Sequence, residues 1–358
     1  MSIVKRLLLL LVVAIAIIIA YLLLWPVPID PVAWTPPTAP SLTGTYQQNN
    51  KLAGTERLPF GQGFAPEDVA IDAAGRIYAG FDDGRIMRLQ SDGTGPELFA
   101  DTKGRPLGLK FDSGGNLIVA DSVKGLLLVD PMGLIRVLST AADGVAFRIT
   151  NDLDIAADGT IYFTDASTRF PLTNYKADIL EHQSTGRLLA YEPASKTTRV
   201  VLGGLSFANG VAISPDQTFV LVAETGEYRV RRYWLTGPRK RQNEVFIDNL
   251  PGFPDGISSN GRDRFWLALP TPRMPIVDRM LPHPFVRKIV ARLPKFLEPA
   301  PQRYSFVLGL DQSGRVIENL QNPSPDCYFK ISNVVEHNGA LYFGSIGEDT
   351  VGRFALRQ

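Results

Sequence analysis

Residues 66–89 read PEDVAIDAAGRIYAGFDDGRIMRL, and this stretch sets the pattern for most of the chain. Short runs of Val, Ile, Ala, Tyr and Met alternate with turn-forming Asp and Gly, which predicts strand, turn, strand, short turn and strand. Five further segments follow the same plan and begin at Arg105, Thr150, Ala208, Pro254 and Ser332. A fourth strand before the next copy is expected from segments such as Glu97–Ala100, Thr198–Leu202 and Glu244–Ile247.

Four-stranded units that repeat every 40–50 residues or so are typical of the blades of a β-propeller. The six copies therefore predict an all-β, six-bladed propeller around a central channel, closed so that no long strand edge stays exposed. We expect this propeller to occupy residues 43–358. The segment Thr43–Leu58 is the candidate for the outer strand that closes the ring.

Two spacings exceed the repeat and predict insertions. The first lies at about residues 169–184 in the third copy, and the second at about residues 271–302, between the fifth and sixth copies. Residues 286–296 of the second insertion have helical spacing and a basic face that includes Arg287 and Arg292. Such a segment suits either a helical lid with a solvated outer face, which we favour, or a helix that lies on a membrane surface.

The bulk composition fits one large all-β unit. The chain has 358 residues, of which 45% are hydrophobic and 20% charged, so a substantial core can form. A net charge of +1 gives no electrostatic reason to expect a nucleic-acid partner. Cys327 is the only cysteine, which excludes an intrachain disulfide, and no P-loop, dinucleotide fingerprint or Gly-x-Ser-x-Gly elbow is present.

The N-terminus predicts a membrane anchor at residues 1–25. Leu7–Leu24 is an uncharged apolar run of 18 residues, which as a helix spans about 27 Å, close to the thickness of a bilayer core. Lys5 and Arg6 precede it and no basic residue follows until Lys51, so the positive-inside rule predicts a cytoplasmic N-terminus and an extracytoplasmic, periplasmic or lumenal propeller. The alternative is a cleaved signal peptide, which the length of the run and its Leu-Trp-Pro end disfavour. The Pro-rich residues 26–42 predict a stiff, extended spacer.

One aligned position of the repeat carries an oxygen-bearing side chain in four copies: Glu67, Asn151, Asn209 and Asp255. In a radial arrangement these side chains aim at one axis, and two carboxylates with two amide oxygens suit a hard divalent cation, above all Ca²⁺. Asn-Gly and Asp-Gly are also ordinary turn formers, so neither position would carry this hypothesis alone. Asp68 and Asp152 adjoin the aligned position and are alternative ligands.

Several phrases resemble the strictosidine synthase-like branch of the six-bladed propellers, which includes the adipocyte plasma-membrane-associated proteins and stands near the gluconolactonase and paraoxonase families. The residues that carry the resemblance are Thr185–Leu189, Phe207–Ala212, Arg231–Leu235, Leu250–Asp255 and Glu336–Ser345. It covers about residues 43–357. In the calcium-dependent hydrolases of this group a central calcium is held by one Glu, two Asn and one Asp, and the matching positions here are Glu67, Asn151, Asn209 and Asp255. The true strictosidine synthases perform a metal-free condensation and lack this set.

The combined expectation is a membrane-anchored, calcium-dependent hydrolase of small-molecule esters or lactones, with arylesterase-like activity and a phosphotriesterase side activity. Asp255 is the expected catalytic carboxylate, acting either as general base or as nucleophile. Two alternatives stay open. One is a non-catalytic propeller that binds a partner, and the other is a metal-free synthase of the strictosidine type.

Overall fold

We describe a computed structural model of the protein, in which residues 2–298 and 301–356 are placed. Met1, residues 299–300 and residues 357–358, which fall within the predicted anchor, insertion and propeller, lie outside the described residues.

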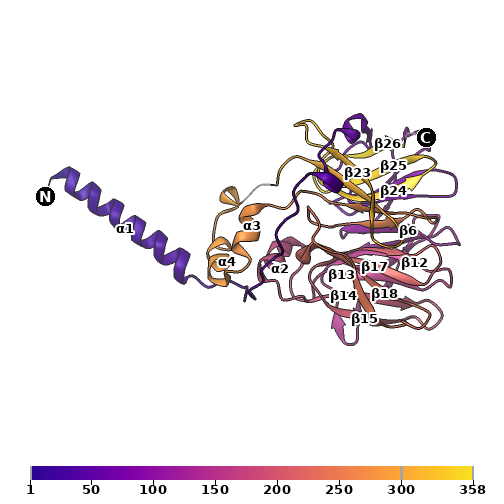
Figure 1. The fold of residues 1–358 in the computed structure, drawn as a ribbon, viewed down its shortest axis with the longest axis horizontal. Helices are drawn as coiled ribbons and strands as arrows, with labels where there is room; N and C mark the ends of the chain where they lie inside the picture. The colour runs from indigo at the N-terminus through magenta and orange to yellow at the C-terminus, as the bar shows by residue number, and fades with distance from the viewer. Residues whose placement is uncertain (1, 299–300, 357–358) are drawn as a thin grey trace.

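The body is a six-bladed β-propeller, as the repeat predicts, and each blade is an antiparallel sheet of four strands (Figure 1). The first three blades contain β2 (Val69–Ile71), β3 (Ile77–Gly80), β4 (Arg85–Leu89) and β5 (Glu97–Asp101); β6 (Pro106–Phe111), β7 (Leu117–Asp121), β8 (Gly125–Val129) and β9 (Ile135–Ser139); and β12 (Thr150–Ile155), β13 (Ile161–Asp165), β14 (Gly186–Glu192) and β15 (Thr197–Leu205). The last three contain β16 (Ala208–Ile213), β17 (Phe219–Glu224), β18 (Arg229–Trp234) and β19 (Asn243–Ile247); β20 (Ile257–Ser259), β21 (Phe265–Ala268), β22 (Ser305–Leu310) and β23 (Val316–Asn322); and β24 (Ile331–His337), β25 (Ala340–Ser345), β26 (Thr350–Ala355) and β1 (Glu56–Pro59). A short hairpin of β10 (Ala141–Ala142) and β11 (Val145–Ala146) follows the second blade.

The ring is closed by a strand from the beginning of the body. Strand β1 pairs with β26, with Glu56 opposite Arg353 and Pro59 opposite Thr350. The expectation that residues 43–58 supply the closing strand is thus confirmed, although the strand itself is short. Strand β17 is buried along its whole length because each blade packs between two neighbours, so its sequence FVLVAE reads as a nearly continuous apolar run.

Carboxylates at the ends of the inner strands hold the turns that the repeat predicts. The Asp72 Oδ1 atom accepts hydrogen bonds from the backbone N–H groups of Ala74 and Arg76. Asp112 does the same in the second blade, and Asp158 caps the turn of the third. These aspartates are therefore structural, because Asx turns of this kind fix the reversal between the first two strands.

Both insertions leave the propeller at the same end. The first joins β13 to β14 and carries helix α2 (Tyr175–Glu181). The second joins β21 to β22 and carries α3 (Pro275–Met280) and α4 (Pro284–Val290). Its predicted place between the fifth and sixth blades is wrong: it lies inside the fifth blade, between the second and third strands. Because inner strands begin where second strands end, both insertions cover the end at which the inner strands start.

The apolar N-terminal segment forms one helix, α1 (Ile3–Leu24), which projects away from the body (Figure 1). None of its residues is buried, and it is long and apolar enough to cross a membrane. The Pro-rich segment that follows is extended, but it packs along the insertion helices. Its Trp34 N–H donates to the Leu281 carbonyl at 3.3 Å, and Ile29 is buried against Phe170 and Ala177.

Candidate metal centre

The four candidate ligands lie where the inner strands of their blades begin. Asn151 and Asn209 sit at breaks in the pairing register of β12 with β13 and of β16 with β17. Such bulges turn a side chain out of the regular pleat, which here frees it from the packing between blades. Glu67 and Asp255 each lie two residues before the first residue of β2 and of β20, respectively. The aligned position of the repeat is therefore one structural position at one end of the channel.

Carboxylates on the second strands fix the chain just before the two asparagines. The Asp165 Oδ1 atom accepts from the backbone N–H of Ile149 at 2.9 Å. The Glu224 Oε1 atom accepts from the N–H of Ser206 at 3.0 Å. Asp165 and Glu224 are both fully buried. Each clamp holds the backbone two or three residues ahead of a candidate ligand, which pre-organises the position.

A pair of threonines connects Asn209 to its neighbours. The Asn209 amide nitrogen donates to the Thr225 hydroxyl at 3.2 Å, and that hydroxyl donates to the Pro254 carbonyl at 2.7 Å. The Thr164 hydroxyl donates to the Asn209 backbone carbonyl at 2.6 Å. With its nitrogen engaged by Thr225, the amide of Asn209 keeps its oxygen available. The Thr225 bridge also sets the backbone directly before Asp255.

Asp255 is a buried carboxylate with no cationic partner. Its backbone is held on both sides, because its N–H donates to the Ala268 carbonyl at 3.0 Å and its carbonyl accepts from Gly210 at 3.1 Å. Its side chain makes no ion pair with any residue that the structure describes. Burial raises the pKa of Asp255 well above its usual value, the Glu67 carboxylate raises it further, and the Asn209 side chain opposes the shift. Burial and the Glu67 carboxylate thus favour the protonated form of Asp255 as long as no cation lies beside it.

Glu67 shares this end of the channel but has a partner. The Arg105 Nη2 atom lies 2.8 Å from its Oε2 atom, and both side chains are largely buried. Burial raises the pKa of Glu67, while the charge and hydrogen bond of Arg105 lower it. Because Glu67 also raises the pKa of Asp255, the two carboxylates lie close enough to interact.

The residue set fits a calcium ion. Asn151 is 6% exposed, and its side chain makes no hydrogen bond to the described residues, so its amide is available. Two carboxylates and two amides give hard oxygen donors, the kind that Ca²⁺ prefers. No group of three or more His, Cys, Asp or Glu side chains gathers anywhere in the described residues, and the candidate set itself contains only two carboxylates. A cation at this position would balance the charge of an ionised Asp255.

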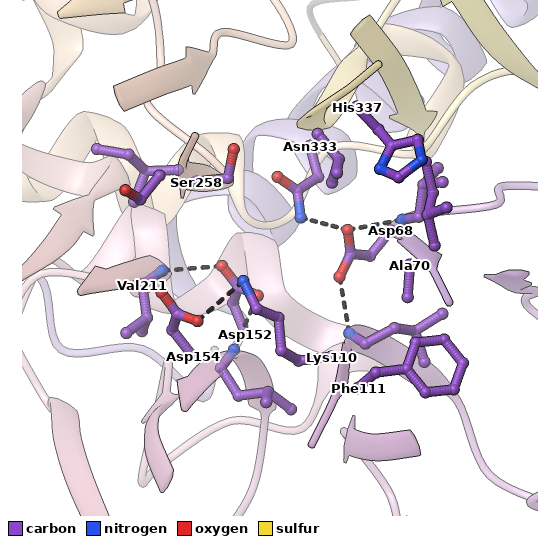
Figure 2. A pocket seen from close by; sticks show the side chains of 17 residues that line it. Asp68, Ala70, Lys110, Phe111, Asp152, Asp154, Val211, Ser258, Asn333 and His337 are labelled. Atoms are coloured by element: carbon purple, nitrogen blue, oxygen red, sulfur yellow. Dashed lines mark hydrogen bonds and ion pairs between the residues drawn. The ribbon is translucent and has the colours of Figure 1, made fainter. Parts of the chain in front are cut away.

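Asp68 and Asp152 are used differently. The Asp68 Oδ2 atom accepts from the N–H of Leu109 at 2.7 Å, and the Asp152 Oδ2 atom accepts from the N–H of Val211 at 2.8 Å. Asn333, at the equivalent position of the sixth blade, donates to Asp68. These side chains tie neighbouring inner strands together, and they line a separate cavity of about 160 Å³ further along the channel (Figure 2).

The first insertion overlooks the candidate ligands. Tyr175 begins α2, and the charges of Glu67 and Asp255 both act on its phenol. The Tyr175 side chain is 38% exposed, and a tyrosine phenol, protonated near neutral pH, can donate a hydrogen bond. The histidines lie elsewhere: His182 is buried beside Trp34, and His337 lines the separate cavity at the far end of β24.

Sequence reasoning missed Arg105, Thr164, Thr225 and Tyr175. Arg105 stands two residues before the aligned position of the second blade, where the copy itself carries Leu107. Its contact with Glu67 joins two neighbouring blades, and the pattern of the repeat does not predict contacts between particular side chains of different blades. A polar residue at the end of a second strand, as in Thr164 and Thr225, was the one local signal present.

Comparisons with known proteins agree with this architecture. The model of the strictosidine synthase family matches residues 151–238, and that of the strictosidine synthase-like N-terminal family matches residues 44–89. Strictosidine synthase-like protein 10 of Arabidopsis thaliana is 39% identical over 323 residues, which cover 81% of this chain and 85% of that protein. The adipocyte plasma membrane-associated protein of Rattus norvegicus is 34% identical over 352 residues, which cover 92% of this chain and 93% of that protein.

Among solved structures, a gluconolactonase from Xanthomonas campestris superposes with a TM-score of 0.63. It covers 92% of this chain and 99% of its own, at 18% identity, so it supports the fold alone. The two protein relatives exceed 30% identity over most of both chains. The chain therefore belongs to the strictosidine synthase-like family, together with the adipocyte plasma membrane-associated proteins.

Proposed function

We propose that the protein is a membrane-anchored, calcium-dependent hydrolase of esters or lactones. The observation that carries the proposal is the buried Asp255 carboxyl beside Glu67 and two amides at one end of the channel. A solved propeller of the same fold is a gluconolactonase, which makes lactones and esters the first substrates to test. The charge asymmetry around α1 supports a propeller outside the cytoplasm.

Glu67, Asn151, Asn209 and Asp255 would hold the ion. When bound with open coordination positions, calcium supplies Lewis-acid polarisation of a substrate carbonyl. Beside a bound cation the Asp255 carboxyl would be ionised, so it could accept a proton from water or attack the substrate directly. Thr225 orients the side-chain amide of Asn209 by accepting a hydrogen bond from its nitrogen. The protonated Tyr175 phenol can donate to a substrate oxygen at the entrance.

The test uses the full chain in lipid nanodiscs, stripped with a chelator. Calcium is titrated by calorimetry into wild type, Asn209→Ala and Asp255→Asn. Asn333→Ala is the position-matched control, because Asn333 occupies the equivalent site of the sixth blade and is engaged by Asp68. We expect one-to-one binding in wild type and in the control, and its loss in the other two variants. Phenyl acetate hydrolysis should require calcium and disappear in Asp255→Asn.

Three results would redirect the assignment. An absence of calcium binding to folded wild type would remove the proposal. Activity that survives chelation would favour metal-free chemistry of the strictosidine synthase type, and calcium binding without turnover of any ester or lactone would favour a binding module.

A further inference from the structure

The carboxyl end of α1 is bonded directly to the second insertion. The Arg292 side chain donates to the Trp25 carbonyl at 2.6 Å and to the Leu22 carbonyl at 2.9 Å. The Tyr21 hydroxyl donates in return to the Arg292 carbonyl at 3.2 Å. Arg292 is only 9% exposed. No free linker therefore separates the membrane helix from the insertion.

The next residues of the chain are fixed as well. The Val32 N–H donates to the Glu181 carbonyl at 2.9 Å, so the segment runs along the end of α2. The guanidinium of Arg287, on α4, is fully buried and donates to the carbonyls of Leu180, at 2.8 Å, and Val32. Helices α2 and α4 and the segment after α1 thus form one packed unit, which sets the position of the body relative to α1.

Large apolar side chains are exposed on this same insertion: Ile276, Phe285, Val286, Phe296 and Leu297. Phe296 is 83% exposed and Phe285 is 59% exposed. Single apolar residues on a surface need no explanation, but five on one short insertion, with Arg279 and Lys288 among them, mark an interaction surface. An apolar face with basic residues interspersed is the composition of a segment that lies at a lipid–water interface.

The distances fit such an interface. Tyr21 and Trp25 are both exposed aromatic residues at the end of the apolar helix, where they mark the level of the headgroups. Phe296 is four residues from Arg292 and so at most about 14 Å from it. Phe285 precedes Arg292 by seven residues, about 10 Å along a helix. Both residues therefore lie within about 14 Å of Arg292, which contacts the end of α1, and the interfacial layer begins there and extends roughly 5–8 Å beyond the hydrocarbon core.

We propose that the outer face of the second insertion lies in the headgroup region of the bilayer that α1 crosses. Figure 1 shows α3 and α4 between α1 and the blades, with α2 beside them. Because both insertions follow second strands, they lie at the end of the ring where the inner strands begin, so this contact turns the ligand-bearing end of the channel toward the membrane. The insertion packs on the body as a lid would, but its outer face contacts lipid in place of water.

The experiment places an environment-sensitive fluorophore on single cysteines in the full chain, reconstituted in phosphatidylcholine nanodiscs. Cys327 is buried, so the label goes to the introduced thiol. The test positions are Phe285→Cys and Phe296→Cys. Met132→Cys is the control, because Met132 is 90% exposed and lies on the turn between β8 and β9, at the opposite end of the propeller.

We expect blue-shifted emission at positions 285 and 296 and at least a twofold loss of intensity when nitroxide-labelled lipid is included. The label at position 132 should emit as in water and stay unquenched. Emission and quenching at 285 and 296 that match the control would overturn the proposal. Neither readout depends on catalysis, so the result stands apart from the fate of the hydrolase assignment.

Discussion

His182 should make the stability of the protein sensitive to mild acid. It ends α2, is 6% exposed, and stacks on Trp34 with ring centroids 4.5 Å apart. Neither ring nitrogen has a hydrogen-bond partner among the described residues. Burial, helped by the positive charge of Arg287, lowers the pKa of His182 from 6.5 to about 4. The folded protein therefore keeps this imidazole neutral well below the pH at which an unfolded histidine is protonated.

The direction and size of the effect follow from that difference. As pH falls below 6.5 the unfolded chain binds the proton first, so stability that is present above 6.5 is lost progressively down to about pH 4. Each unit of pKa difference corresponds to about 1.4 kcal/mol, which gives a full loss of about 3 kcal/mol. Between about pH 7.5 and about pH 5 the linkage relation gives a loss of about 2 kcal/mol.

His182→Phe removes the titration and keeps an aromatic ring against Trp34. Thermal unfolding of the full chain in nanodiscs is measured for wild type and variant at both pH values. Other groups titrate in the same range, but they are common to both proteins and cancel in the comparison. At roughly 2 °C per kcal/mol for a domain of this size, wild type should lose about 4 °C more than the variant. Melting curves that shift equally would refute the assignment of a neutral, buried His182.

Three further predictions concern the candidate metal centre. Arg105→Met leaves the Glu67 carboxylate buried and unpaired, so the chelated protein should lose about 1–3 kcal/mol of stability, and excess calcium should restore much of it in thermal melts. Calcium affinity should rise with pH, because the raised pKa of Asp255 lets a proton compete with the metal for this carboxylate. Calorimetry in buffers of different ionisation enthalpy should detect the proton released on binding, and an affinity that does not change with pH would contradict this prediction. Thr225→Val removes the hydroxyl that holds Asn209, so calcium should bind about 10–100-fold more weakly, while Thr225→Ser should bind as wild type does.

The sequence predicted the fold because the fold is a repeat. Strands of the same type recur at similar spacings, and the aligned position marks the start of each inner strand. That is why Glu67, Asn151, Asn209 and Asp255 could be identified together although they are far apart in the chain. Because the blades are arranged radially, residues at one aligned position of the repeat occupy equivalent places around the channel.

What breaks the symmetry could not be predicted in the same way. The long spacing between Ala268 and Ser305 hid the third strand of the fifth blade and displaced the predicted insertion. The contact of Arg105 with Glu67 joins two blades through an arginine at a position where the other copies carry Ala, Ile or Phe. The Pro-rich segment has the composition of a free spacer, and its docking depends on Arg287, which lies about 250 residues later.

The topology gives the two ends of this propeller different chemistry. Inner strands begin, and second strands end, at the same end of the ring, so the ligand positions and any insertion after a second strand must lie together there. The hydrogen bond from Arg292 to the Trp25 carbonyl also places the end of α1 on that side of the propeller. At the other end, backbone N–H groups of a neighbouring inner strand donate to inner-strand carboxylates. For example, the Ile213 N–H donates to the Asp154 Oδ2 atom at 2.9 Å, so this carboxylate connects two blades. A change in the second insertion should therefore alter both the entrance to the candidate site and the proposed lipid contact, whereas a change in the opposite turns, such as that around Met132, should alter neither.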